Sequence, residues 1–171
     1  FFNINGEIDQ AFIGSGTGRQ DLALANAATQ LPMATYKLQE SLMPHAALQW
    51  GLAQYKFTRY KNIEVKPRQL VLAEKDLQDT LALTNAIFLV RDLINTPPND
   101  MAPQHLAEVM QNLATQHNGL FEQWVGDELL EHNYPAIHAV GRASASAPRL
   151  LSITWGHKEH PRIALIGKGV C

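Results

Sequence analysis

The α/β character of this chain is clearest in Arg162-Ile-Ala-Leu-Ile-Gly-Lys-Gly-Val-Cys171, which joins a short apolar run to a lysine between two glycines. An apolar run of this length, here residues 163–166, is typical of a buried strand. Glycines at a strand end let the backbone approach a ligand closely, and packing alone does not explain a lysine between them. The sequence therefore predicts a strand that ends at a functional lysine, Lys168.

The residues before this run alternate between helix and strand patterns. A helix is predicted to begin at Pro103, with apolar side chains on one face, and to close at Asn118-Gly119. A short helix is predicted after Asp127, whose carboxylate can cap it. The predicted strands of this part are residues 121–125, 150–155 and 163–166. Such an order is typical of an α/β fold in which helices pack on a central mixed sheet.

The front of the chain predicts a smaller α/β unit. Its predicted strands are residues 7–13, 33–38 and 69–73. Asp21 can cap a first predicted helix, and Ser41 with Pro44 opens a second one that reaches Tyr55. We therefore expect a small N-terminal domain over residues 1–75, incomplete at its start.

A long helix is predicted over residues 76–94, where two rows of apolar side chains form a wide stripe. Such a stripe indicates a helix that is covered on more than one side. The helix should end before Asn95-Thr-Pro-Pro-Asn-Asp100, because two prolines forbid its continuation, and we interpret this segment as structural. Residues 76–171 are expected to form a linker helix and the first, truncated part of a catalytic domain.

The composition excludes several classes of protein. The chain has 171 residues, of which 46% are hydrophobic and 18% charged, a balance typical of globular domains. A net charge of −2 gives no electrostatic case for binding nucleic acid or an anionic membrane, and no apolar run is long enough to span a bilayer. The single cysteine, Cys171, fits a reducing compartment, and we do not expect it to act as a nucleophile. Because the chain begins without Met, we expect an interior piece of a longer polypeptide.

Three segments, in this order, resemble the leucyl (cytosol) aminopeptidase family. They are Arg91-Asp-Leu-Ile-Asn-Thr-Pro-Pro-Asn-Asp100, then Ala139-Val-Gly-Arg-Ala-Ser144 followed by Ala147-Pro-Arg-Leu150, and finally Ala164-Leu-Ile-Gly-Lys-Gly-Val170. The resemblance is good over residues 76–171 and weak in the front third of the chain. The order and spacing of the three segments make it specific.

The resemblance implies a concrete activity for the complete protein. Members of this family are two-metal exopeptidases that remove N-terminal residues from peptides, usually as cytoplasmic homohexamers. In them the lysine of the Gly-Lys-Gly turn is a metal ligand, and the matching residue here is Lys168. Their other ligands, all carboxylates, follow that turn, as do a second active-site lysine and a bicarbonate-binding arginine. No catalytic residue is therefore matched within this chain.

The chemistry of Lys168 limits what the chain does by itself. An amine ligates a metal only when it is neutral, and a nearby dication favours loss of its proton. One amine cannot hold the two divalent ions, manganese or zinc, that the resemblance implies, because such a centre requires a set of carboxylates. We therefore expect this piece alone to bind no metal, to be inactive, and to carry Lys168 as an exposed amine.

Two alternatives come from other functional classes. The first is a non-catalytic α/β module for binding or assembly. The second is nucleotide binding by Gly14-Ser-Gly-Thr-Gly18, which lies between a predicted strand and a predicted helix. That segment lacks the Gly-Lys-Ser/Thr ending of a phosphate-binding loop, so a flexible turn is favoured.

Several other residues invite functional interpretations that we weigh against simpler ones. His157 and His160 are interpreted as a solvated hairpin tip rather than a metal site, and His138 as packed or hydrogen-bonded. His105 and His117 are expected to be exposed. Residues 55–61 mix aromatic and basic side chains, but a helix end that docks on the front domain is favoured over a nucleic-acid surface. Arg142 and Ser144 are interpreted as loop residues, with a subunit contact as the alternative.

Overall fold

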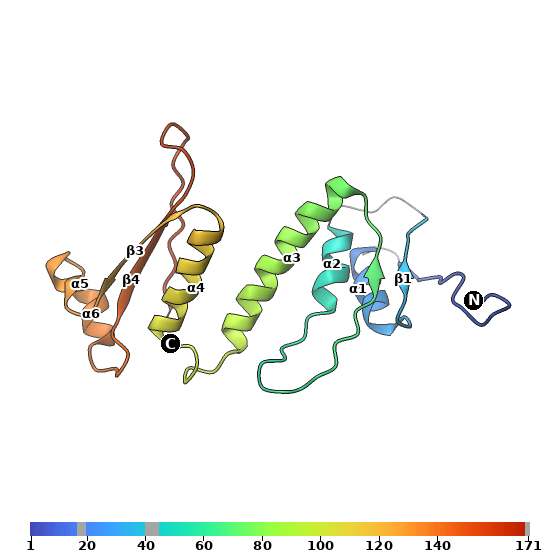
Figure 1. Ribbon diagram of the computed structural model, residues 1–171, viewed down its shortest axis with the longest axis horizontal. Coiled ribbons are helices and arrows are strands. Elements are labelled where there is room, and N and C mark those ends of the chain that lie inside the picture. Colours follow the sequence, from blue (N-terminus) through green and yellow to red (C-terminus); the bar gives the residue numbers. More distant parts are fainter. Residues whose placement is uncertain (17–19, 40–44, 170–171) are drawn as a thin grey trace. The chain divides into compact units, whose positions relative to one another are not determined.

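The computed structural model describes residues 1–16, 20–39 and 45–169. It divides into two compact units, Phe1–Asn95 and Thr96–Cys171, which we describe separately (Figure 1). Helices and small sheets are mixed along the described chain, so the α/β class predicted from the sequence is confirmed. In the described residues no helix is both long enough and apolar enough to cross a bilayer.

The first unit combines helices with one small parallel sheet. Its helices are α1 (Gln20–Gln30), α2 (Ala46–Ala53) and α3 (Glu74–Asn95), and its strands are β1 (Thr35–Tyr36) and β2 (Gln69–Leu70). The strands pair in parallel with Thr35 opposite Gln69, and Thr35 Oγ1 donates a hydrogen bond of 2.7 Å to Gln69 Oε1. The helices and strands predicted between residues 21 and 94 are thus present, although the strands are shorter than predicted. Ser41 and Pro44, predicted to open the second helix, lie outside the described residues.

The core of the first unit lies where α1 crosses α2. Its buried members are Leu24, Ala27, Ala28, Ala46 and Trp50. Trp50 is only 4% exposed, and its indole Nε1 donates a hydrogen bond of 3.1 Å to the carbonyl oxygen of Arg68. Small alanines let the two helices approach, while Trp50 supplies most of the apolar bulk. The core therefore fixes the loop before β2 as well as the helices.

The long helix α3 is covered on one side only within the described residues. Thr84 is buried against α2, whereas Leu83, Val90 and Ile94 of the second apolar row are 46%, 52% and 76% exposed. The expectation that α3 is covered on more than one side is therefore wrong for this structure. The reason is that, among the described residues of this unit, α2 is the helix that packs substantially against α3, so it covers one face of α3.

The predicted strand over residues 7–13 does not form. Instead, Asn3 Oδ1 accepts hydrogen bonds of 2.9 Å from the backbone N–H groups of both Asn5 and Glu7, which closes a turn. Phe2 and Ile8 then form a single isolated antiparallel bridge. Backbone hydrogen bonds from Asn3 N–H to the Glu7 carbonyl and from Asp9 N–H to the Phe1 carbonyl accompany this turn, so the backbone pairs locally instead of forming a regular strand.

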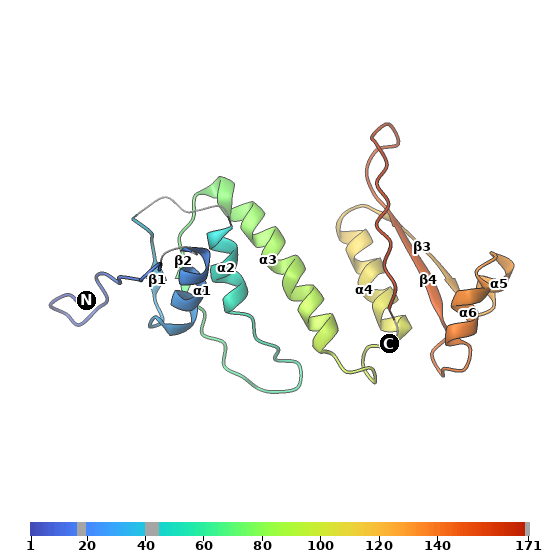
Figure 2. The same cartoon turned by 180° about the vertical axis from the view of Figure 1, so that it is seen from behind.

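The second unit contains an antiparallel pair of strands with helices around it. Its elements are α4 (Pro103–Gln116), β3 (Leu120–Val125), α5 (Glu128–Glu131), α6 (Pro135–Gly141) and β4 (Arg149–Thr154). Phe121 lies opposite Ile153 in the ladder, and α4 packs against both strands (Figure 2). The predicted close of the first of these helices is confirmed, because Asn118 is left-handed, with a φ of 55°, and Gly119 N–H donates 2.7 Å to the carbonyl oxygen of Ala114.

The predicted strand over residues 163–166 is absent. Residues 163–166 form neither helix nor strand. Their large side chains are solvent-exposed: Ile163, Leu165 and Ile166 are 85%, 94% and 96% exposed. An apolar run becomes a strand only when another strand supplies its backbone hydrogen bonds, and none of the described segments does so here.

The domain limits of 1–75 and 76–171 stay a prediction about the complete protein. In the structure α3 packs against α2 and so falls in the first unit, and the division lies at its carboxyl end. A single central mixed sheet likewise remains an expectation, because the described residues form one parallel and one antiparallel pair.

Candidate functional site

The candidate site is centred on Lys168, in the extended segment that follows β4. Its side chain is exposed and forms no ion pair with another described residue. A β-carbon added at either neighbouring glycine, Gly167 or Gly169, would meet no atom within 4 Å. None of the described residues therefore packs against the backbone of these two glycines.

The described part of the chain does not supply the donors of a metal centre. It contains no cluster of three or more histidine, cysteine, aspartate or glutamate side chains that could hold an ion. A divalent cation in a catalytic or structural centre usually takes at least three protein ligands, most of them oxygens for manganese. Lys168 offers one nitrogen, so the residues described here do not by themselves fit a two-metal centre.

The loop between α6 and β4 is held from three directions. Ser146 Oγ donates a hydrogen bond to Gln104 Oε1 at the start of α4, and Gly126 N–H after β3 donates 2.9 Å to the carbonyl oxygen of Pro148. Pro148 also packs directly on Gly141, the last residue of α6. The loop is therefore anchored to α4, β3 and α6, and this anchoring fixes where β4 begins.

Arg142 and Ser144 lie on the exposed side of this loop. Ser144 Oγ accepts a hydrogen bond of 3.2 Å from Ser146 N–H, which is a local contact within the loop. Cys171, which we do not expect to be a nucleophile, lies outside the described residues.

Side chains at the carboxyl end of α3 contact Tyr55, which follows α2. Its phenol donates 2.7 Å to Asp92 Oδ1 and accepts 3.0 Å from Asn95 Nδ2. The guanidinium of Arg91 lies 5.3 Å from the centre of the Tyr55 ring and donates 2.9 Å to the carbonyl oxygen of Leu52. Partial burial and the hydrogen bond to Asp92 raise the pKa of the Tyr55 phenol. These contacts dock the end of α2 on the carboxyl end of α3, which lies outside the front domain of residues 1–75 on which the docking of residues 55–61 was expected.

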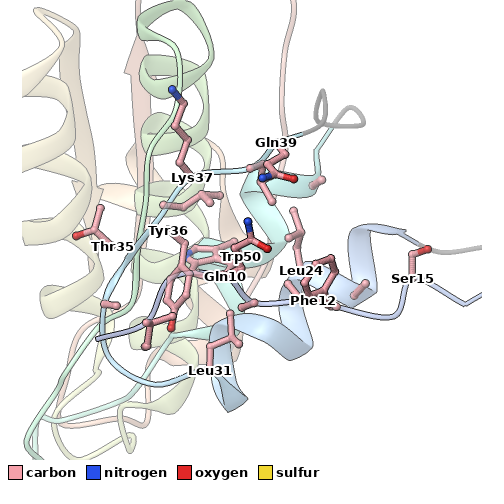
Figure 3. A pocket seen from close by; sticks show the side chains of 18 of the residues that line it. Gln10, Phe12, Ser15, Leu24, Leu31, Thr35, Tyr36, Lys37, Gln39 and Trp50 are labelled. Atoms are coloured by element: carbon pink, nitrogen blue, oxygen red, sulfur yellow. The ribbon is translucent and has the colours of Figure 1, made fainter. Parts of the chain in front are cut away.

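A cavity of about 610 Å³ lies in the first unit (Figure 3). It is lined by Leu24, Tyr36 and Trp50 together with Phe12 of the N-terminal segment. The polar atoms of its aromatic residues are already used, because Tyr36 OH donates 2.7 Å to the carbonyl oxygen of Pro32 and the Trp50 indole binds Arg68. The Lys37 amine points away from the aromatic side chains (Figure 3). The phenol and indole donors of this cavity are therefore not free to bind a ligand.

The glycine-rich segment does not form a phosphate cradle in its described part. A β-carbon at Gly14 or Gly16 would meet no atom within 4 Å, so neither glycine is needed for a close approach of backbone. Gly16 has a φ of 62°, which is consistent with a turn. Gly18 lies outside the described residues.

Of His105, His117 and His138, two follow the sequence interpretation. His138 Nε2 lies 3.0 Å from Asp127 Oδ1, so its predicted hydrogen bond is confirmed, and His117 is exposed as predicted. The expectation of a solvent-exposed His105 is wrong, because its Nδ1 accepts a hydrogen bond of 3.0 Å from Ala102 N–H at the start of α4. A histidine at the third position of a helix can bind back to the capping residue, and Pro103 in between signals that helix start.

No sequence pattern predicts the bond between Ser146 and Gln104 or the contact between Gly141 and Pro148. Gln104 and Ser146 are 42 residues apart, and no periodicity or motif relates them. Gly141 was the one available signal, because a glycine often marks a position where another part of the chain comes close to the backbone.

Comparison with known proteins gives consistent matches. The family model described as cytosol aminopeptidase family, catalytic domain, matches residues 88–171. A probable cytosol aminopeptidase of Wolinella succinogenes is 32% identical over 169 residues, which cover 84% of this chain and 35% of that protein.

Two solved structures are also similar. The cytosol aminopeptidase of Coxiella burnetii superposes with a TM-score of 0.86 at 26% identity, over 94% of this chain and 36% of that one. The bottromycin maturation enzyme BotP in complex with Mn has a TM-score of 0.68 at 24% identity, over 81% of this chain and 33% of that one, which is a likeness of fold. The chain thus spans about a third of the length of these proteins.

Proposed function

The chain belongs to the cytosol aminopeptidase family, and on that premise we propose that the complete protein is a metal-dependent aminopeptidase acting on the N-terminal residues of peptides. The observation that carries the proposal is the match over residues 88–171, which includes the segment around Lys168. Residues 139–144, 147–150 and 164–170 hold the motifs through which this part resembles the family.

The role assigned to Lys168 is that of a metal ligand in the complete protein. Lys168 is exposed and lies between Gly167 and Gly169, at the position that matches the ligand lysine of the family. The amine must be neutral to ligate, so binding of the metal releases a proton at Lys168 Nζ. A pair of divalent ions, when bound, would activate a water molecule for attack on a peptide carbonyl.

The piece described here is proposed to be inactive alone. Its described residues supply one amine and no cluster of three or more other donors. The missing ligands are proposed to be carboxylates that follow residue 171 in the complete protein. Manganese and zinc are the metals to test first, and the BotP structure, which contains Mn, supports beginning with manganese.

The cellular and quaternary setting is part of the same proposal. A cytoplasmic homohexamer with peptide substrates is the state that the family resemblance favours, and Arg142 and Ser144 are exposed residues available for a subunit contact. We further propose the division into an N-terminal domain, residues 1–75, and a linker helix with catalytic domain from residue 76.

The test is an assay of the complete protein on aminoacyl amides, with and without a chelator. We expect activity to disappear on chelation and to return with Mn²⁺ or Zn²⁺. We expect Lys168→Ala to lower activity by more than about 100-fold, the upper end of losses seen for residues that only support metal ligands. Lys75→Ala, which removes an exposed lysine of α3, is the matched control and should keep full activity.

Two results would contradict the proposal. Activity that persists in chelator and in Lys168→Ala would exclude the metal-dependent mechanism. A complete protein that neither hydrolyses aminoacyl amides nor takes up manganese or zinc would instead favour the non-catalytic binding or assembly module.

A further inference from the structure

A pair of potential metal donors, His157 and His160, lies outside the segment around Lys168, in the turn that follows β4. The chain leaves the strand at Trp155 and bends at Gly156, whose φ of 98° places it in the left-handed region. His160 N–H then donates a hydrogen bond of 3.1 Å to the carbonyl oxygen of His157. This bond closes a four-residue β-turn with one histidine at each end.

The turn brings the two imidazole rings together. Their centroids are 5.3 Å apart, and the ring planes are inclined at 75°. Two imidazole nitrogens bound to one tetrahedral Zn²⁺ at about 2.0–2.1 Å place their ring centroids roughly 5 Å apart. The two rings are therefore already at the separation that chelation of one ion requires.

The imidazoles are also available for binding. Both histidines are exposed, and within the described residues neither ring forms a hydrogen bond or an ion pair. The central residues of the turn, Lys158 and Glu159, carry opposite charges, so they do not set up a net charge that would repel a cation.

The sequence alone favours a solvated hairpin tip here, but the closed turn and the paired rings change that interpretation. We propose that His157 and His160 form a bidentate site for a late first-row divalent cation such as Ni²⁺, Cu²⁺ or Zn²⁺. Water completes the coordination, because the described residues hold no cluster of three or more donors. Imidazole nitrogens favour these ions over Mg²⁺, Ca²⁺ or Mn²⁺, which prefer oxygen ligands. The site is distinct in chemistry from the carboxylate-rich centre proposed for the complete enzyme, and it does not depend on that proposal.

The test is calorimetric titration of the metal-free complete protein with NiCl₂, comparing wild type with His157→Ala and His160→Ala. We expect one Ni²⁺-binding event to weaken at least tenfold in either variant, because each leaves a single imidazole. His117→Ala removes an exposed histidine elsewhere and should leave that event unchanged. Circular dichroism checks that the exposed turn variants keep the wild-type fold.

Electron paramagnetic resonance with one equivalent of Cu²⁺ gives a second readout. We expect coupling to two nitrogens in a Lys168→Ala background, and to one after His157→Ala or His160→Ala is added. Unchanged Ni²⁺ affinity in both single variants, or copper spectra that do not differ between them and wild type, would overturn the proposal. Loss of aminopeptidase activity has no bearing on these readouts, so the two proposals fail separately.

Discussion

Gly141 and Pro148 are packed so closely that no other residue fits at position 141 without a shift. A β-carbon built on Gly141 would lie 2.9 Å from Pro148 Cγ and 3.2 Å from its Cα, and closer still to its Cβ. Gly141 is the last residue of α6, and Pro148 immediately precedes β4. The pair therefore joins the helix to the strand across the loop that separates them.

Replacing Gly141 with alanine should destabilise the protein despite the higher helix propensity of alanine. Overpacking against a proline ring and its backbone costs about 1–3 kcal/mol, which exceeds the gain of about 1 kcal/mol expected for Gly→Ala inside a helix. Thermal or denaturant unfolding measures the change. Gly14→Ala is the control, because a β-carbon there would meet no atom within 4 Å. A Gly141→Ala variant as stable as wild type would show that the two residues separate readily.

Replacing Gly51 with alanine should weaken the packing of α2 on α3. A β-carbon at Gly51 would lie 2.9 Å from Thr84 Oγ1 and 3.2 Å from Thr84 Cγ2. We expect Gly51→Ala to cost about 1–3 kcal/mol in unfolding free energy. The double variant Gly51→Ala/Thr84→Ala removes both of those Thr84 atoms and should recover most of the loss. An additive double variant would contradict the contact.

Replacing Trp50 with alanine should cost about 3–5 kcal/mol, the usual range for a large buried aromatic side chain. Trp50 is 4% exposed and also donates a hydrogen bond to the Arg68 carbonyl. Trp155→Ala is the matched control, because Trp155 is 74% exposed and should change stability by less than about 0.5 kcal/mol. Equal unfolding midpoints for the two variants would contradict the assignment of Trp50 to the core of the first unit.

Replacing Tyr55 with phenylalanine should destabilise the protein at neutral pH and matter less in alkali. The pKa of the Tyr55 phenol is raised in the folded protein, so the phenol stabilises the fold below its unfolded pKa of about 10. As the pH rises from that value through the higher folded pKa, the folded state holds more protons than the unfolded state, and this stability is lost.

The measurement is the difference in unfolding free energy between wild type and Tyr55→Phe from pH 7 to pH 11. We expect a constant difference up to about pH 9 and a smaller one above pH 10. Using the difference removes the contributions of other alkaline groups. A difference that grows with pH would show that the sign of the shift is wrong.

Replacing Lys168 with arginine tests whether the proposed role needs a neutral amine or only a positive charge. Arginine keeps its charge at all accessible pH values and cannot donate a lone pair to a metal. We expect Lys168→Arg to lose as much manganese or zinc as Lys168→Ala, measured as bound metal per complete chain by mass spectrometry. Retention of full metal content in Lys168→Arg would refute ligation by this residue.

Local patterns were sufficient for most of the helices. The prolines at 97, 98 and 103 and the pair Asn118-Gly119 mark helix boundaries by backbone chemistry alone, and α3 and α4 are found where those signals place them. The alternating pattern of 7–13 and the apolar run of 163–166 were misleading for the opposite reason. A strand is defined by its partner: in the described residues 163–166 has none, and 7–13 has only the single bridge between Phe2 and Ile8.

The candidate site divides in the same way. The sequence by itself singled out Lys168, because a lysine between glycines and the order of three motifs are local features that need no neighbour. Only the tertiary structure placed Pro148 on Gly141, Ser146 beside Gln104 and Asp92 beside Tyr55. Those pairs join elements that are separate in sequence, and their distances depend on how helices and strands pack, which no spacing along the chain records.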